Sequence, residues 1–317
     1  MTDTQNEVFK TPVNKIRLFD HGAPGSQNLK LTRKYYTEDM PDGRVKHIVQ
    51  NITDPDIVPY IPDGIGNSTD RQRVPAVLII PGGAFRRLVY NFEGEDVAKW
   101  LNSMGIAAFV LECRLPSDEH DNAEDVPLID AMRAMRVIRG RAQEFGIDEA
   151  KIGVMGFSAG GFMAALLSTA YESDVYADYK YKDEYDKLSA RPDFAVCSYP
   201  VISIDDCIEA GKRYMSEEQV LERISDSKAK ILHKYNPDKL VRPDMPPVFI
   251  CETDDDRTTL SENSVGFYMA ARKAGVSAEL HIFRTGGHGY GCGDDFAQTG
   301  EWKVLFTKWI KSIGIIS

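Results

Sequence analysis

Ser158 stands in the pattern G-x-S-x-G, which residues 156–160 spell as Gly-Phe-Ser-Ala-Gly. An apolar run over 152–157 leads into the pattern, and a second apolar run follows it. This order predicts a strand, a sharp turn and a helix, the context in which the pattern carries a nucleophilic serine. Side chains at Gly156 and Gly160 would collide across so tight a turn, which explains the glycines. We therefore expect the turn to lift the serine hydroxyl above the sheet.

A serine nucleophile needs a nearby base to take its proton. Among the six histidines, His288 has glycines on both sides, in residues 285–291, and it follows an apolar run that ends at Phe283. A loop of this kind can carry the imidazole across a site. His281 lies inside a strand pattern, and the other histidines precede the candidate strands or lie in charged loops. His288 is therefore the predicted general base, with a solvated loop histidine as the alternative.

Three consecutive aspartates, Asp254, Asp255 and Asp256, follow the apolar run 248–251. A carboxylate there can accept a hydrogen bond from the imidazole, fix its tautomer and stabilise the imidazolium. The spacing to the next predicted helix favours Asp256 as this acid, with Asp255 as the second candidate. The aspartates could instead bind a hard cation. No second cluster of ligands accompanies them, so we predict neither a metal nor another cofactor.

The segment Pro81-Gly82-Gly83-Ala84-Phe85 follows another apolar run, 74–80. A backbone N–H can approach a substrate oxygen closely only where side chains are small. The N–H groups of Gly83 and Ala84 are candidate donors to an oxyanion, together with that of Ala159 at the start of the predicted helix. The alternative is an ordinary Pro-Gly turn.

Each of these candidates follows an apolar run, and the runs alternate with helical patterns from residue 74 to the last residue. The runs are residues 74–80, 106–111, 152–157, 194–199, 248–251 and 278–283. Alternation of this kind predicts an α/β fold with right-handed crossovers and a mainly parallel sheet with helices on both faces. Sites in such sheets form beyond the carboxyl ends of the strands, where the candidate residues would meet.

The rest of the chain is interpreted as attachments to one domain that spans residues 1–317. Residues 1–43 are polar and predict an N-terminal arm lying on the domain, and residues 53–73 are rich in proline and glycine and predict loops. Two stretches, 171–192 and 202–243, interrupt the alternation. Both can be solvated insertions, and 202–243 is the candidate for a small cap over the strand ends.

Together these motifs resemble those of α/β-hydrolase carbohydrate esterases, in the acetyl xylan esterase-like branch related to the lipase/esterase group with an HGGG loop. The resemblance covers about residues 74–317. Outside the candidate site it is carried by Glu93-Gly94, Arg114-Leu115-Pro116, Arg133-Ala134-Met135-Arg136, Tyr199-Pro200 and Glu262-Asn263-Ser264. This chain has Ala84 where relatives commonly carry a third glycine, and Phe162 where they often have histidine.

The resemblance implies an α/β-hydrolase fold with a small cap insertion and hydrolysis of esters, often acetyl groups on sugars, without a metal. It implies that the nucleophile, base and acid are Ser158, His288 and Asp256, with Gly83, Ala84 and Ala159 as oxyanion donors. The alternatives are a serine peptidase of the prolyl-oligopeptidase type and a non-catalytic ligand-binding protein on the same fold.

Composition narrows the partners to a small-molecule ester substrate, with an acetylated sugar as one candidate. The 317 residues carry a net charge of −10, which argues against nucleic acid or an acidic membrane surface as the main partner. No apolar stretch reaches the ~18 residues of a membrane span. The five cysteines are dispersed and the N-terminus has no leader pattern, so we expect a cytoplasmic protein. A homo-oligomer is compatible with the sequence.

Overall fold

A computed structural model describes residues 9, 12–65, 73–216, 218–220, 227–293 and 298–317. Within this part of the chain the main sheet has eight strands, in the order β1-β4-β7-β5-β8-β9-β10-β11. Their bounds in that order are Ile16–Arg17, Asp56–Tyr60, Ala107–Glu112, Val74–Ile80, Ile147–Phe157, Ala195–Ser198, Val248–Thr253 and Ala278–Phe283. All six strands predicted from the apolar runs are present, so the predicted alternation is confirmed.

The six neighbouring strands β7, β5, β8, β9, β10 and β11 run parallel. Their register brings the candidate residues to one edge of the sheet. Ile80 at the end of β5 lies opposite Gly156 in β8, and Phe157 lies opposite Ser198 in β9. The loops that follow these strands are therefore neighbours, as the α/β interpretation requires.

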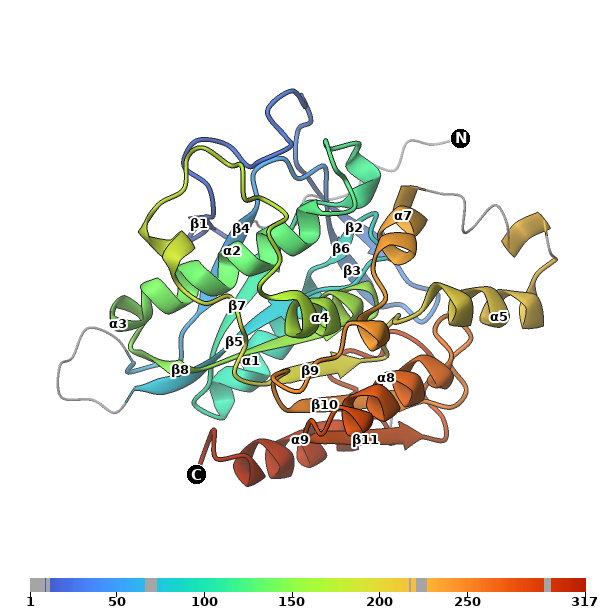
Figure 1. The fold of residues 1–317 in the computed structure, drawn as a ribbon. Coiled ribbons are helices and arrows are strands. Elements are labelled where there is room, and N and C mark those ends of the chain that lie inside the picture. Colours follow the sequence, from blue (N-terminus) through green and yellow to red (C-terminus); the bar gives the residue numbers. More distant parts are fainter. Residues whose placement is uncertain (1–8, 10–11, 66–72, 217, 221–226, 294–297) are drawn as a thin grey trace.

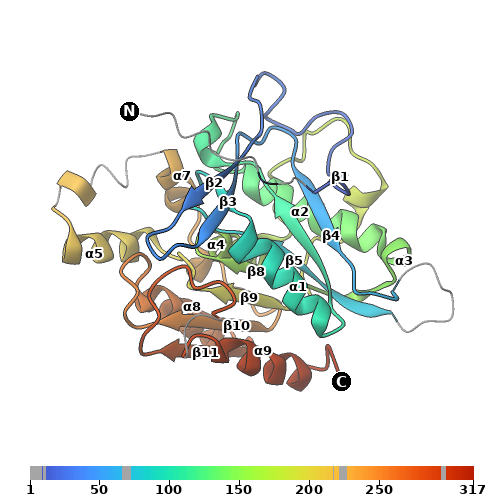
Figure 2. The same ribbon diagram turned by 180° about the vertical axis from the view of Figure 1, so that it is seen from behind.

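Helices cover both faces of this sheet, which confirms the predicted fold class. Figure 1 shows α2 (Val126–Gly140), α4 (Ala159–Ala170) and α8 (Ser261–Lys273) in front of the sheet. Figure 2 shows α1 (Asp96–Ser103) and α9 (Glu301–Ser312) on the opposite face. There the rings of Trp100 and Trp302 pack edge to face at 4.9 Å between centroids. Strands covered on both faces bury successive side chains, which is why β5 is apolar throughout and β7 is apolar up to its last residue, Glu112.

One predicted helix is interrupted. In the sequence, apolar residues recur at helical spacing from Val126 to Phe145, which predicts a single helix. The structure instead ends α2 at Gly140 and forms a short α3 over Ala142–Phe145. Arg141 between them has φ −103° and ψ 17°, outside the helical region. Because the apolar spacing continues across Arg141, the sequence pattern could not reveal the end of α2.

The loop predicted for residues 53–73 contains a strand that the sequence interpretation missed. β4 pairs antiparallel with β7, and Pro59 lies within it opposite Phe109. A proline is tolerated there because the outer neighbour, β1, pairs only with Asp56 and Ile57, which leaves the remainder of β4 as a sheet edge. The prolines of this segment therefore mark an edge strand as well as turns.

The N-terminal arm is also more ordered than expected. Besides β1, it contains β2 (Lys34–Asp39), which forms a small antiparallel sheet with β3 (Val45–Gln50) and β6 (Leu88–Val89). β6 lies directly after the predicted oxyanion loop, and Ile48 of β3 is opposite Val89. The N-terminal region therefore braces the far end of that loop. Whether the whole chain forms one domain stays a prediction.

The candidate cap segment holds α5 (Ile204–Tyr214), α7 (Ser227–Lys234) and the 3₁₀ turn η4 (Pro237–Lys239), and part of it falls outside the described residues. In Figure 1, α5 and α7 lie on the side toward which the arrows of β9 and β11 point. Asp125, just before α2, accepts hydrogen bonds from Lys234 and Tyr235 and so ties the end of α7 to the main body. Residues 171–192 contain only the 3₁₀ turn η3 (Glu184–Lys187) among the described elements.

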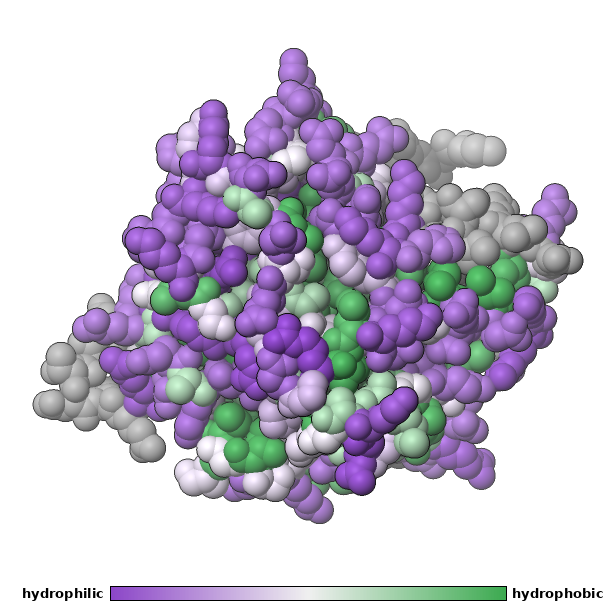
Figure 3. Space-filling model, in the orientation of Figure 1, coloured by the Kyte–Doolittle hydropathy of each residue, from purple (hydrophilic) through white to green (hydrophobic). Residues whose placement is uncertain are grey.

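The surface in the view of Figure 1 is mostly hydrophilic, with a group of hydrophobic residues over α5 (Figure 3). No helix in the described ranges is both long and apolar enough to cross a bilayer.

Candidate active site

Ser158 sits on a strained turn between β8 and α4. Its φ of 53° and ψ of −118° are unusual for a residue with a side chain. A Cβ on Gly156 would strike the carbonyl of Gly160 across the turn, as expected. The reason for Gly160 differs from the prediction, because a Cβ there would meet the carbonyl oxygens of Ile80 and Pro81 instead. Gly160 therefore allows the turn that carries Ser158 to pack against the start of the oxyanion loop.

The structure brings Ser158, His288 and Asp256 together from three distant segments. His288 Nε2 lies 2.8 Å from Ser158 Oγ, and His288 Nδ1 lies 2.6 Å from Asp256 Oδ2. The serine is 9% exposed and the aspartate 2%. Burial raises the pKa of Asp256, but its bonds to His288 and to the N–H groups of Thr259 and Thr258 outweigh this, so the pKa is held below its ordinary value. The aspartate is thus an anion that can hold one imidazole tautomer. The catalytic roles of the three residues stay a prediction.

Asp255, the second candidate for the acid, has a different place. Its Oδ1 accepts the backbone N–H groups of Gly286 and Gly287 at 2.9 and 2.8 Å. Thr253 Oγ1 donates to the carbonyl of Gly287 at 2.8 Å. Asp255 therefore anchors the loop that carries His288 and does not touch the ring. The described residues hold no group of three His, Cys, Asp or Glu side chains suited to a metal ion.

The predicted oxyanion loop is closed by its own hydrogen bonds. The N–H groups of Arg86 and Arg87 donate to the carbonyl of Gly83, and Val89 N–H donates to the carbonyl of Gly82. Gly83 has a φ of 137°, and a Cβ there would collide with the backbone of Arg87. Within the described residues no acceptor binds the N–H groups of Gly83 or Ala84, so both are available to a ligand. This fits the predicted donor role, which stays a prediction.

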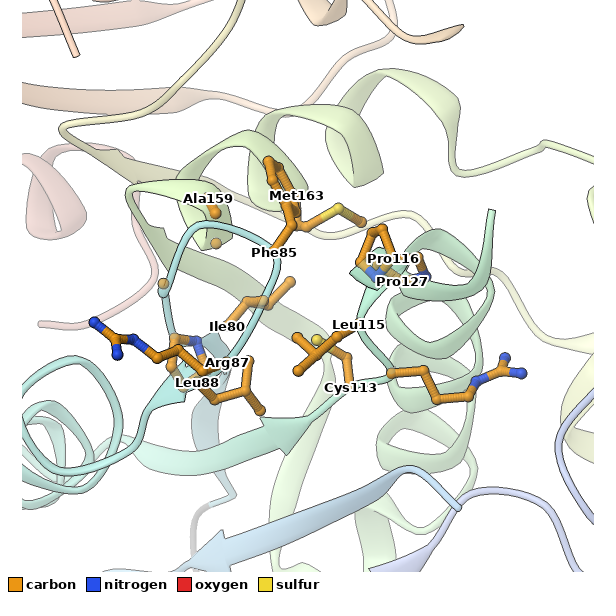
Figure 4. Close-up of a pocket in the computed structure, with 14 residues that line it drawn as sticks. Ile80, Phe85, Arg87, Leu88, Cys113, Leu115, Pro116, Pro127, Ala159 and Met163 are labelled. Atoms are coloured by element: carbon orange, nitrogen blue, oxygen red, sulfur yellow. The ribbon is translucent and has the colours of Figure 1, made fainter. Parts of the chain in front are cut away.

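Phe85 and Phe162 pack against each other beside this loop, with ring centroids 5.5 Å apart and ring planes at 90°. Phe162 is fully buried and supports the loop through this contact. Next to them is a small apolar cavity with about 10 Å³ of free space, room for about one water-sized group. Figure 4 shows Phe85 and Met163 close together on the Ala159 side of the cavity, while the Arg87 side chain extends away from it.

Glu93 and Tyr199 connect the loops of the site through hydrogen bonds. The sequence interpretation assigned no role to either residue. Glu93 is 5% exposed, and its carboxylate accepts the N–H of Gly82 at 2.8 Å and the hydroxyl of Tyr199 at 2.9 Å. Burial raises the pKa of Glu93, and the nearby charge of His288 and the bond from Tyr199 partly offset this rise. The signals were indirect: both residues belong to motifs of the family resemblance, and Tyr199 is the last residue of a predicted strand.

Comparison with known proteins decides the family. The model of the BD-FAE family matches residues 65–270, which is more than half of the chain. The protein belongs to the BD-FAE family. Its resemblance to acetyl xylan esterase-like α/β-hydrolases is therefore confirmed.

Two curated proteins are similar to this BD-FAE member. An acetylxylan esterase of Xylanibacter ruminicola is 31% identical over 240 residues, which cover 75% of this chain and 45% of that protein. An endo-1,4-beta-xylanase B of Butyrivibrio fibrisolvens is 31% identical over 227 residues, covering 71% of this chain and 34% of that protein. The chain thus spans less than half the length of these curated relatives.

Two solved structures are also similar to this BD-FAE member. An acetyl ester-xyloside bifunctional hydrolase from Caldicellulosiruptor lactoaceticus is 37% identical with a TM-score of 0.66, and the match covers 83% of this chain and 90% of that one. A carboxylesterase from Lactobacillus plantarum has the same TM-score of 0.66 at 20% identity, covering 90% and 99% of the two chains. The second likeness supports the fold alone.

Proposed function

We propose that the protein is a serine carboxylic-ester hydrolase that removes acetyl or other short acyl groups from sugars or small esters. One observation carries the proposal: the Ser158 hydroxyl lies 2.8 Å from the imidazole of His288, which in turn lies 2.6 Å from the Asp256 carboxylate. A hydroxyl next to an oriented base is an activated nucleophile.

The proposed reaction uses this geometry. His288 Nε2 accepts the hydroxyl proton as Ser158 Oγ attacks the carbonyl carbon of the ester. The N–H groups of Gly83, Ala84 and Ala159 receive the negative charge on the tetrahedral oxygen, and each such donor typically contributes about 3–4 kcal/mol. The C–O bond to the alcohol breaks as the alcohol takes the proton from His288. Water, deprotonated by His288, then releases the acid and restores the serine.

The proposed substrate class rests mainly on the relatives. The names of the similar proteins describe an acetylxylan esterase and an acetyl ester-xyloside hydrolase. The cavity beside Ala159 is also lined by Gly82 and Phe85 of the oxyanion loop, and we propose that it takes the acyl group of the ester. Its free space of about 10 Å³ admits a group of roughly the size of one water molecule, which favours the methyl of an acetyl group over a longer chain. An acetylated xyloside or xylo-oligosaccharide is thus the proposed natural class of substrate.

The test is a screen of purified protein against para-nitrophenyl esters of increasing chain length, acetylated mono- and oligosaccharides, and aminoacyl amides. We expect the highest kcat/KM for acetyl esters, release of acetate from the sugars, and no amide hydrolysis. Faster cleavage of the amides would favour a peptidase, and no turnover of any ester would reject the proposal.

We further propose a cytoplasmic location. Cys197 and Cys251 are fully buried thiols on the neighbouring strands β9 and β10, as suits a reducing compartment. Fractionation of source cells with an antibody to the protein tests this, and recovery from the culture medium would contradict it. A homo-oligomer is a further expectation, and light scattering of the purified protein tests it.

A further inference from the structure

Glu93 connects the two loops that the proposed reaction needs. Its Oε2 accepts the N–H of Gly82 at 2.8 Å, and its Oε1 accepts the hydroxyl of Tyr199 at 2.9 Å. We propose that Glu93 is a positioning residue, which sets the oxyanion loop through Gly82 and the His288 loop through Tyr199. The inference rests on the proposed ester hydrolysis at Ser158.

On the oxyanion side, Glu93 holds the peptide directly before the predicted donors. Residue Gly82 is fixed on both sides: Glu93 accepts its N–H, and Val89 N–H donates at 2.9 Å to its carbonyl, which belongs to the same peptide group as the Gly83 N–H. A Cβ on Gly82 would lie 2.6 Å from the Glu93 carboxylate and 3.0 Å from Ser158 Cβ, so this peptide has little room to shift. A change at Glu93 is therefore passed on to the N–H groups of Gly83 and Ala84.

On the base side, the contact runs through one hydroxyl. Tyr199 donates to Glu93 and accepts the N–H of Gly291 at 3.1 Å. The carbonyl of Gly291 is held in turn by Trp302 Nε1 at 3.0 Å. The Tyr199 ring also packs edge to face on the ring of His288, with centroids 5.0 Å apart. Tyr199 thus fixes the loop just after the histidine, while Asp255 fixes it just before.

The local backbone supports a functional reason for this carboxylate. Glu93 lies in η1 (Asn91–Glu95), a π-helical turn ahead of α1, in which Glu95 N–H donates to the carbonyl of Tyr90. Such turns are rare and concentrate at functional sites. A buried carboxylate also costs stability unless its bonds compensate. The rare turn and the costly burial are both consistent with a Glu93 carboxylate that is retained for its two hydrogen bonds, to Gly82 and Tyr199.

The experiment compares four variants on para-nitrophenyl acetate and with a boronic acid that forms a tetrahedral adduct on the serine. Glu93→Ala should lower kcat by roughly 10²- to 10³-fold, the loss expected when a preorganised donor site is disturbed. KM should change by less than about threefold, and boronate affinity should fall in parallel with kcat. Glu93→Gln keeps an acceptor oxygen for Gly82 and should recover kcat to within roughly tenfold of wild type.

Tyr199→Phe keeps the ring and removes both hydroxyl bonds, and should lower kcat by roughly tenfold. Tyr60→Phe is the matched control, because it removes a hydroxyl bond to Tyr90, at 3.0 Å, without touching either loop. Its kcat and boronate affinity should equal those of wild type. If Glu93→Ala fails to fold, Glu93→Gln and Tyr199→Phe still decide the matter.

Three results would overturn the inference. An active wild type with unchanged kcat and boronate affinity in the Glu93 and Tyr199 variants would reject the positioning role alone. A lower unfolding temperature without a parallel loss of kcat and boronate affinity would show that Glu93 is only structural. A wild-type protein that neither cleaves the ester nor binds the boronate would instead reject the proposed function, and the inference with it.

Discussion

Asp256 Oδ2 lies 2.6 Å from Nδ1 of His288. Its neighbour Asp255 binds the backbone of Gly286 and Gly287 just before that histidine. Two adjacent carboxylates thus serve one loop in different ways, since one contacts the ring and the other contacts the chain that carries it. The difference gives a matched pair of variants.

Asp256→Asn should lower kcat by about 10⁴-fold, because the amide favours the wrong imidazole tautomer and cannot stabilise the imidazolium. Asp255→Asn keeps a carbonyl oxygen for the two glycine N–H groups and should lower kcat by less than roughly tenfold. Steady-state kinetics on an acetate ester measures both. A reversed order of the two variants would contradict the assignment of the acid.

Gly156 offers a test of the nucleophile turn. Gly156→Ala places a methyl group against the carbonyl of Gly160 and should cost ~3 kcal/mol or more of stability. Gly266 is the control, because it lies in the middle of α8 with nothing within 4 Å of an added Cβ. Gly266→Ala should stabilise the protein by about 0.5–1 kcal/mol. Urea unfolding gives both values, and a neutral Gly156→Ala would show that the turn can relax.

Phe85 limits the cavity beside Ala159. Phe85→Ala should enlarge this space and shift the preference from acetyl toward butyryl esters by roughly 10- to 100-fold in relative kcat/KM, the usual scale for one or two methylene groups in a pocket. Arg87→Ala is the control, because that side chain lines the same cavity but points out of it (Figure 4). An unchanged chain-length profile in Phe85→Ala would mean that the acyl group binds elsewhere.

Asp118 predicts a dependence of stability on pH. Burial raises its pKa to about 6, although the N–H of Ile52 donates to it. The folded pKa is above the ordinary value of 3.8, so the folded state holds a proton that the unfolded state releases between these values. The free energy of unfolding should therefore fall as pH rises from 4 to 6.

Asp118→Asn keeps the acceptor oxygen but cannot ionise. Relative to wild type it should gain about 1–2 kcal/mol between pH 4 and pH 7, a figure reduced for partial exposure of the group. Thermal unfolding at the two pH values gives this difference. If the stability of Asp118→Asn relative to wild type is the same at pH 4 and pH 7, this would contradict the raised pKa of Asp118.

The parallel strands could be predicted because burial on both faces demands unbroken apolar runs, as in β5 and β7. β4 could not, because its acceptance of Pro59 depends on how short its neighbour β1 is, which is a property of the assembled sheet. The break at Arg141 was hidden for a related reason, since the helices on either side of it bury the same face.

The candidate site shows the same division. Ser158 and His288 stand in glycine-rich segments directly after apolar runs, and such local patterns are visible in a sequence. The separate places of Asp255 and Asp256 depend on how the loop after β11 folds back, which spacing alone left open. The contacts of Glu93 and Tyr199 join segments 106 residues apart, so they are visible only in the folded structure.

The central claim is that His288 activates Ser158 beside three backbone N–H donors. Its most direct test is covalent labelling with an organophosphonate, with the modified residue located by mass spectrometry. We predict rapid, stoichiometric labelling of Ser158 in wild type, labelling at least roughly 10³-fold slower in His288→Ala, and none at this position in Ser158→Ala. Labelling of a different residue, or a wild-type protein that does not react, would contradict the account.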